Sequence, residues 1–261
     1  MDLDRIRFDF CKNDYAIIDL PIPKSGKGGR TKESVQDVVA FLASELELGK
    51  PYTPPLYQMS SSQNYTESGG FSHVGGPAHS SNHPAFTSSK ELDLHTDGSL
   101  DSIGDVQTSI LACINPASEG GDSVLFRSAA MAEKLVVEGD VDLEALFSLL
   151  ALRRHTTIAE RNSHADGPVL DWKGKQIVSR YCITPRDEWR YDAVPGLKEA
   201  REAFEASVKN YTGHIAKVRM LKGQAIIMNN NRISHGRTAF IDDPSRPRHI
   251  VRALFRRSVA V

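Results

Sequence analysis

A mainly β-sheet domain with helices packed on its outside is the fold class that the sequence predicts, and three observations support it. Short apolar or alternating segments bounded by Gly, Pro, Asn and Asp recur along the chain, which is typical of strands. Apolar residues at helical spacing gather only within residues 31–48, 128–149 and 196–212. The 261 residues, 40% of them apolar and 25% charged, suffice for a substantial core, so we expect residues 1–261 to form one domain.

The first part of the chain predicts one strand and one helix. Residues 15–20 predict the strand, and a loop rich in Pro, Gly and Lys follows it. Thr31 is expected to cap a helix that Gly49 and Pro51 end. The apolar stripe of this helix consists of Val35, Val38, Val39, Leu42 and Leu46. We expect that stripe to pack on a sheet as scaffold.

Residues 60–90 differ from the rest because Ser, Gly, Asn and His dominate their composition. Such a composition is typical of a solvated flexible loop. A loop of this length inside a compact domain is also typical of an active-site lid. We therefore expect a lid or substrate-entry segment at 60–90. Its histidines, His73, His79 and His83, match neither a helical face nor a strand face and are assigned no role.

Residues 92–98 (LDLHTDG) combine a predicted strand with two side chains that can bind a metal. The leucines alternate as in a strand, and His95 and Asp97, two positions apart, project to the same side. His235, far downstream, would add a second imidazole. Two imidazoles and one carboxylate, with the remaining positions open, form the ligand set of non-haem Fe(II) that activates oxygen. An H-x-D pattern alone is also compatible with a surface turn.

The remaining segments continue the strand-rich pattern. Glycine-containing turns lie at 120–121, 166–167 and 173–174. Helices are predicted at 128–138, capped by Ser128, and at 142–150 and 196–212. Strands are predicted at residues 106–115, 122–126, 153–157, 168–172, 176–183, 215–221, 224–228 and 249–257.

Four motifs in a fixed order carry a resemblance to a known family. They are H-x-D at 95–97, G-G-D-S at 120–123, N-R-x-x-H-G-R-x-x-F at 231–240 and R-x-x-x-R at 248–252, and together they span about 160 residues. The chain thereby resembles the Fe(II)/2-oxoglutarate-dependent dioxygenases, in the branch around taurine dioxygenase and clavaminate synthase. The resemblance implies a double-stranded β-helix (jelly roll), a fold that the strand-rich pattern with outer helices also suits.

The resemblance also implies roles for individual residues. His95, Asp97 and His235 would hold Fe(II) and leave positions for 2-oxoglutarate and O2. Arg248, thirteen residues after His235, would bind the far carboxylate of 2-oxoglutarate, which needs a charged, planar, bidentate partner. Ser123 would hydrogen-bond the same carboxylate, although on composition alone it could equally be the first residue of a strand.

Arg252 is the residue from which we infer a substrate class. It follows Arg248 by four positions and therefore lies on the same side of a strand. In clavaminate synthase-like enzymes the arginine at this place pairs with an anionic group of the substrate, which implies a carboxylate-bearing substrate such as an amino acid. A surface salt bridge is the competing interpretation, because five arginines crowd residues 246–257.

Related enzymes carry an insert over the active site, and we expect residues 153–195 to be that insert. Four side chains of this segment could line a substrate pocket, although aromatic side chains are more often core residues. They are Trp172, Tyr181, Arg186 and Trp189.

The expected reaction is oxidation of a substrate C–H bond, with hydroxylation as the default, coupled to conversion of 2-oxoglutarate and O2 to succinate and CO2. Desaturation and oxidative cyclisation use the same iron ligands. Chlorination is not expected, because halogenases of this family replace the carboxylate that Asp97 keeps. Two hypotheses from other classes remain. A cupin-like metal-dependent isomerase or hydrolase would not need Arg248 and Ser123, and a non-catalytic jelly-roll binding protein would use its histidines as polar core residues.

Charge and cysteine content bear on the partners and the compartment. The formal net charge of −1 gives no electrostatic support for nucleic-acid binding. The three cysteines are widely spaced and match neither a disulfide framework nor a zinc motif. The first residues are charged and no apolar run reaches the length of a membrane span. We therefore expect a cytoplasmic protein that acts on a small molecule.

Overall fold

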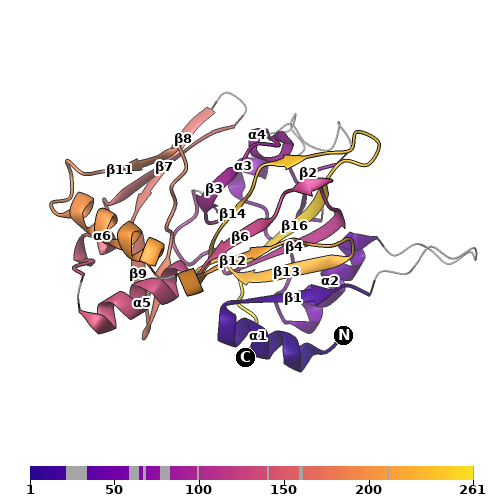
Figure 1. Ribbon diagram of the computed structural model, residues 1–261, viewed down its shortest axis with the longest axis horizontal. Coiled ribbons are helices and arrows are strands. Elements are labelled where there is room, and N and C mark those ends of the chain that lie inside the picture. The colour runs from indigo at the N-terminus through magenta and orange to yellow at the C-terminus, as the bar shows by residue number, and fades with distance from the viewer. Residues whose placement is uncertain are drawn as a thin grey trace, which may run out of the picture.

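The computed structural model describes residues 1–21, 34–58, 65–66, 69–76, 83–98, 100–139, 141–158, 161–210 and 212–260. The chain is mostly β-sheet, as the sequence predicts, with few helices (Figure 1). Its centre consists of two antiparallel sheets. The larger sheet has the order β1-β13-β4-β16-β2. Its strands are β1 (Tyr15–Asp19), β13 (Gln224–Asn229), β4 (Thr108–Asn115), β16 (His249–Phe255) and β2 (Phe71–Gly75).

The second sheet has four strands in the order β12-β6-β14-β3. They are β12 (Ile215–Val218), β6 (Ser123–Phe126), β14 (Ser234–Arg237) and β3 (Leu92–His95). Apolar side chains from both sheets share one cluster, so the sheets pack face to face. The buried members of that cluster are Cys113, Leu125, Met220, Ile226, Met228, Ile233 and Ile250.

Helices α1 (Leu3–Asn13) and α2 (Val35–Glu45) cover the outer face of the five-stranded sheet (Figure 1). Apolar side chains of these helices and of the outer face of the sheet form a second cluster, the outer cluster. Strand alternation supplies its sheet side, because Val251, Ala253 and Phe255 point outward from β16 while Ile250 points inward. The sheet is therefore buried on both faces, and its strands carry long apolar runs.

Both of these helices differ in part from the sequence expectation. Helix α2 begins one residue after Ser34, whose side chain accepts from the backbone of Asp37 in a capping box, and Thr31 lies outside the described residues. Helix α1 was not predicted. Most of its residues are charged or exposed, and only Ile6 and Phe10 are buried. Two buried residues form too sparse an apolar stripe to be recognised in the sequence.

A second group of elements lies to the left of the two sheets in Figure 1 and has its own apolar cluster. It holds a three-stranded sheet in the order β11-β7-β8 and a hairpin of β9 and β10. Its helices α5 and α6 pack in the same cluster. The bounds are α5 (Ser128–Glu138), β7 (Leu152–Ile158), β8 (Arg161–Gly167), β9 (Leu170–Lys173), β10 (Gln176–Ser179), β11 (Asp187–Trp189) and α6 (Leu197–Asn210).

Several predictions for this group need correction. Ser128 is the first residue of α5 instead of its cap, and its hydroxyl donates to the carbonyl of Arg232 at 3.4 Å. The helix predicted at 142–150 is only a 3₁₀ turn, η1 (Glu144–Phe147), because Ser148 is extended. Strand β8 was missed because its sequence, RNSHADG, has no apolar alternation.

The segment predicted as a lid at 60–90 is in part regular structure. Its residues Phe71–Gly75 form β2, which pairs with β16 and closes one edge of the five-stranded sheet. Residues Pro84–Thr87 form the short helix α4, and Pro55–Gln58 just before the segment form α3. Residues 60–64, 67–68 and 77–82 of the predicted lid lie outside the described residues.

The smaller elements complete the fold. Strands β5 (Glu119–Gly120) and β15 (Phe240–Ile241) pair with each other, and η2 (Thr212–His214) precedes β12. No helix in the described part of the chain is both long enough and apolar enough to cross a membrane.

The outer cluster gives a first testable prediction. Leu42 of α2 is fully buried there, whereas the adjacent Phe41 is 55% exposed. Leu42→Ala should lower the free energy of unfolding by about 2–5 kcal/mol through lost burial and a residual cavity. Phe41→Ala, the matched control, should change it by no more than about 0.5 kcal/mol. Urea denaturation measures both, and equal losses would contradict this packing of α2.

Candidate metal centre

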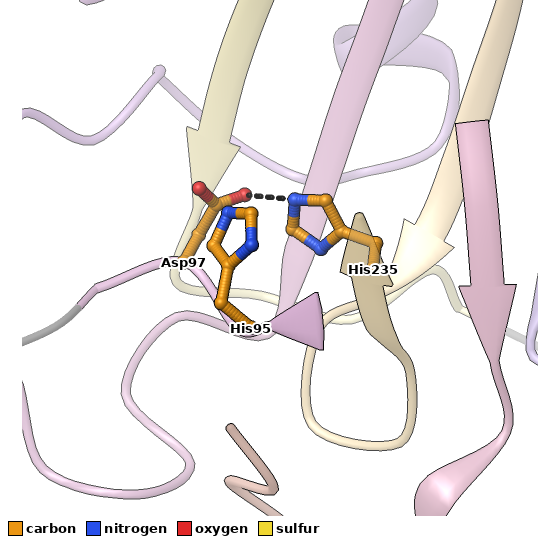
Figure 2. A group of neighbouring side chains, drawn as sticks. All are labelled: His95, Asp97 and His235. Carbon is orange, nitrogen blue, oxygen red and sulfur yellow. Dashed lines mark ion pairs between the residues drawn. The ribbon is translucent and has the colours of Figure 1, made fainter. Parts of the chain in front are cut away.

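Three side chains that the sequence singled out come together between β3 and β14. His95 is the last residue of β3 and lies directly opposite His235 of β14, while Asp97 follows two positions after His95. One ligand atom from each of His95, Asp97 and His235 lies within 4.8 Å of the others. Figure 2 shows the two imidazoles and the carboxylate turned toward one another. The His235 Nε2 to Asp97 Oδ2 distance is 3.7 Å, so one ion could contact all three.

Hydrogen bonds hold two of these three residues, His95 and Asp97, in place. The Nδ1 of His95 donates to the carbonyl of Asp93 at 2.9 Å, because a carbonyl can only accept, and this leaves Nε2 as the lone-pair nitrogen. Asn230 holds the backbone of Asp97 on both sides: its Oδ1 accepts from the Asp97 amide at 2.8 Å and its Nδ2 donates to the Asp97 carbonyl at 3.2 Å. The segment His95–Asp97, called the ligand turn below, is therefore bonded to the connection between β13 and β14.

The protonation states suit a divalent cation. Burial lowers the pKa of His95, and burial followed by the charge of His95 lowers the pKa of His235 to about 3. Burial alone would raise the pKa of Asp97, but Arg252 and the two histidines outweigh it and hold that pKa below its usual range. Neutral imidazoles and an ionised carboxylate are the forms that bind metal.

Arg252 contacts the carboxylate of Asp97 directly. Its Nη1 donates to Asp97 Oδ1 at 2.6 Å, while the hydroxyl of Ser109 donates to Oδ2 at 2.7 Å. The guanidinium also lies over the ring of Phe86, 4.8 Å from its centroid. Its Nε is buried and donates to no partner among the described residues. Arg252 is thus 9% exposed and inside the fold, which excludes the surface salt bridge considered from the sequence.

Arg248 and Ser123 both face the space between the two sheets. Arg248 precedes β16 and alternates with the inward-facing Ile250 and Arg252. Ser123 begins β6 on the same side as the inward-facing Leu125, opposite Arg237 of β14. Arg248 is 5% exposed and Ser123 is 4% exposed. No hydrogen bond joins Arg248 and Ser123.

The guanidinium of Arg248 makes no ion pair in the described part of the chain, although the Asp242 carboxylate, which accepts from the Arg248 backbone amide at 2.9 Å, lies near enough to act on its charge. Its Nη1 is buried without a hydrogen-bond partner there, and burial lowers the pKa of the residue. The guanidinium carbon lies 5.4 Å from the ring centroid of Phe240. A small cavity beside it is lined by Cys113, Gly121 and Met220. An unpaired buried cation is costly, so this position fits an anionic ligand.

Other functional candidates were not found from the sequence. Ser109 and Asn230 both contact Asp97. In the sequence, Ser109 stands out only as a polar residue within an apolar strand, and Asn230 only as part of a run of three asparagines. His83, given no role above, stacks on Phe86 with ring centroids 4.2 Å apart and lies 4.9 Å from the ring of Tyr65. This aromatic cluster therefore borders Arg252.

The other side chains considered from the sequence lie elsewhere. Tyr181 and Trp189 belong to the core of the second group of elements, Trp172 is 48% exposed, and Arg186 is exposed. His73 contacts His249, with 2.6 Å between Nδ1 and Nε2, on the opposite face of β16. His79 lies outside the described residues.

Two histidines and one carboxylate grouped on neighbouring strands are the donor set typical of the non-haem Fe(II) oxygenases. The family model described as "Taurine catabolism dioxygenase TauD, TfdA family" matches residues 37–254. The chain therefore belongs to the TauD/TfdA family. It is a dioxygenase that uses Fe(II), 2-oxoglutarate and O2, as the resemblance implied.

Comparison with characterised proteins adds relatives and fold neighbours. A uridine-5'-phosphate dioxygenase of Amycolatopsis sp is 37% identical over 221 residues, 83% of this chain and 78% of the relative. One of Streptomyces sp is 31% identical over 220 residues, 83% of this chain and 77% of the relative. An asparagine oxygenase structure matches with a TM-score of 0.66 at 16% identity, covering 97% of this chain and 77% of that one. The oxygenase OrfP with Fe and α-ketoglutaric acid has a TM-score of 0.58 at 17% identity, covering 97% and 79%.

The buried His83 next to this centre gives a prediction for acid stability. Burial, with Arg252 next, lowers its pKa from 6.5 to about 3. Between these values the unfolded chain binds more protons than the folded one, so stability falls as the pH falls, by about 1.4 kcal/mol per pH unit. His83→Asn keeps an acceptor for the Ala85 amide and does not titrate.

We expect the free energy of unfolding of His83→Asn to depend less steeply on pH than that of the wild type between pH 6 and 4. Urea denaturation at several pH values measures the two slopes. Because only slopes are compared, any constant loss from the missing ring does not matter. Parallel curves for the two proteins would contradict the neutral, buried state of His83.

Proposed function

We propose that this enzyme oxidises a C–H bond of a nucleoside 5'-monophosphate, with hydroxylation as the default outcome. The observation that carries the substrate class is the 37% identity to a uridine-5'-phosphate dioxygenase across 83% of the chain. The balanced reaction consumes substrate, 2-oxoglutarate and O2 and yields hydroxylated substrate, succinate and CO2. Desaturation and oxidative cyclisation would use the same residues and would differ only in the product.

In this proposal His95, Asp97 and His235 hold Fe(II), which when bound supplies the activation of O2 that couples 2-oxoglutarate decarboxylation to substrate oxidation. The neutral imidazoles and the ionised carboxylate support that assignment. Arg248 binds the far carboxylate of 2-oxoglutarate, and its unpartnered Nη1 supports that role. Ser123, buried on the same inner face, adds a hydrogen bond.

Arg252 is proposed to face both the iron ligand and the substrate. Its Nη1 is committed to Asp97, whereas its Nε is without a partner in the described part and could donate to an anion. Either a phosphate or a carboxylate suits a guanidinium. The amino-acid substrate inferred from this residue therefore stays a second candidate, because the contact does not favour one anion over the other.

We also infer that the two sheets form one double-stranded β-helix, with the β7–β11 region as an insert. Support comes from the order of strands along the chain. Strands β2, β4, β13 and β16 lie in one sheet, and β3, β6, β12 and β14 lie in the other. The chain thus passes back and forth between the sheets, which brings the distant His95 and His235 onto neighbouring strands.

Substrate-dependent succinate formation tests the reaction and the substrate together. With Fe(II), 2-oxoglutarate and O2, the wild type should release succinate on addition of uridine 5'-phosphate, and His95→Ala should lose at least 100-fold because a metal ligand is gone, an estimate of about 3 kcal/mol. A parallel pool of free amino acids tests the second candidate. If the amino acids stimulated succinate release and uridine 5'-phosphate did not, the nucleotide proposal would be wrong. If no condition gave succinate, the proposed oxygenase reaction would be wrong.

Arg248→Gln should raise the KM for 2-oxoglutarate by about 10- to 100-fold, because a charge-assisted hydrogen bond is worth about 1.5–3 kcal/mol. Arg256→Gln is the matched control. Arg256 lies just after β16, is exposed and stacks on Tyr52, so its loss should leave the KM unchanged. A steady-state titration of 2-oxoglutarate measures both variants, and a shift of similar size in each would argue against a specific role for Arg248.

A further inference from the structure

We propose that the buried pair of Arg154 and Asp187 is a positioning device for the metal ligands. It acts through Thr96, the residue between His95 and Asp97, and it links the three-stranded sheet of β7, β8 and β11 to the metal centre. The inference rests on the proposed role of His95 and Asp97 as iron ligands. Neither residue of the pair touches a ligand side chain, so both are positioning residues.

The contacts to Thr96 come from one guanidinium. Arg154 Nη2 donates to the Thr96 carbonyl at 3.0 Å, and Nη1 donates to its hydroxyl at 3.4 Å. Thr96 is 3% exposed, so these bonds lie inside the fold. Asn230 holds the next residue, Asp97, from the β13–β14 connection. The ligand turn is therefore clamped from two sides, by the central sheets and by the second group of elements.

The guanidinium is itself held in place by strand pairing. Arg154 of β7 lies directly opposite Asp187 of β11, with 3.6 Å between Nε and Oδ1. The second carboxylate oxygen of Asp187 accepts from the amide and the hydroxyl of Thr184, at 2.9 and 2.7 Å. Each side chain of the ion pair is 4% exposed. A fixed acid thus orients the arginine, and the arginine orients the turn.

Fold stability alone does not account for this pair. Well-packed apolar residues in place of a buried ion pair are often as stabilising or more so, because both charges lose their hydration. The Nε of Arg154 even lacks a hydrogen-bond partner in the described part of the chain. What apolar residues could not supply is the pair of donors to Thr96. The geometry of the ligand turn is therefore the property that this pair secures.

The same strand provides a matched control. Arg153 precedes Arg154 in β7 and points to the other face of the sheet, where it makes a bidentate pair with Asp166 at 2.6 and 2.8 Å. Its side chain is 27% exposed, and no bond to the ligand turn involves it. Arg153 and Arg154 are thus the same residue type on the same strand, and each pairs with an aspartate. Only Arg154 contacts Thr96.

The test measures Mn(II) binding by electron paramagnetic resonance in the purified full chain, together with the metal-free unfolding temperature. The double variant Arg154→Met/Asp187→Leu removes both charges and the clamp. We expect it to unfold near the wild-type temperature and to bind Mn(II) about 10- to 100-fold more weakly, the usual cost of losing an outer partner of a metal site. Arg153→Met/Asp166→Leu should leave Mn(II) affinity unchanged.

A folded double variant with wild-type Mn(II) affinity would overturn the proposal. Should that variant fail to fold, Arg154→Lys compared with Arg153→Lys decides. Lysine keeps the charge but not the planar fork, so Arg154→Lys should bind Mn(II) several-fold more weakly than Arg153→Lys, and equal affinities would overturn the proposal. An error in the proposed metal ligands can be told apart from an error in this inference. In that case His95→Ala would bind Mn(II) with the same affinity as the wild type.

Discussion

The antiparallel pairing of β3 with β14 is the constraint on which the rest of this structure depends. It sets His95 opposite His235, although 140 residues separate them in the chain. Side chains on paired strands that face the same side lie only about 5 Å apart, so the register alone brings the two imidazoles within reach of one ion. A shift of that register by one residue would turn His235 to the other face of the sheet. On its other side β14 pairs with β6, where Leu125 lies opposite His235 and is buried in the apolar cluster between the sheets, and this burial helps to fix the face that His235 presents.

Electrostatics place a second demand on the same site. Asp97 is the only acid of the triad, yet Arg252 also donates to it, and Arg248 lies unpaired on the same inner face. Without further anions the interior would hold more positive than negative charge. If a divalent cation bound at Asp97 and dianionic 2-oxoglutarate bound at Arg248, as proposed, their charges would cancel, whereas either one alone would shift this balance by two charges. Cofactor and co-substrate binding are therefore linked through one buried charge balance.

The sequence predicted those parts of the site that follow from local periodicity. A strand projects alternate side chains to one side, so His95 with Asp97, and Arg248 with Arg252, could be grouped without coordinates. Ser109 and Asn230 could not, because their partner Asp97 lies 12 and 133 residues away, and nothing local points to it. The same limit applies to the fold. Helix α2 and strand β13 have strong apolar patterns and were found, whereas β8 is polar and is held by its pairing with β7.

Arg252 shows a further limit of prediction from sequence. The resemblance assigns it one role, substrate binding, whereas in the structure it also contacts Asp97. The guanidinium holds Asp97 through Nη1, lies over Phe86 and keeps Nε available. An anionic substrate that bound to that Nε would also displace the guanidinium that orients Asp97, the proposed iron ligand. Substrate binding and ligand geometry are then coupled, with a free energy that each exerts on the other by the same amount. The substrate anion would thereby act on the metal centre without touching the metal.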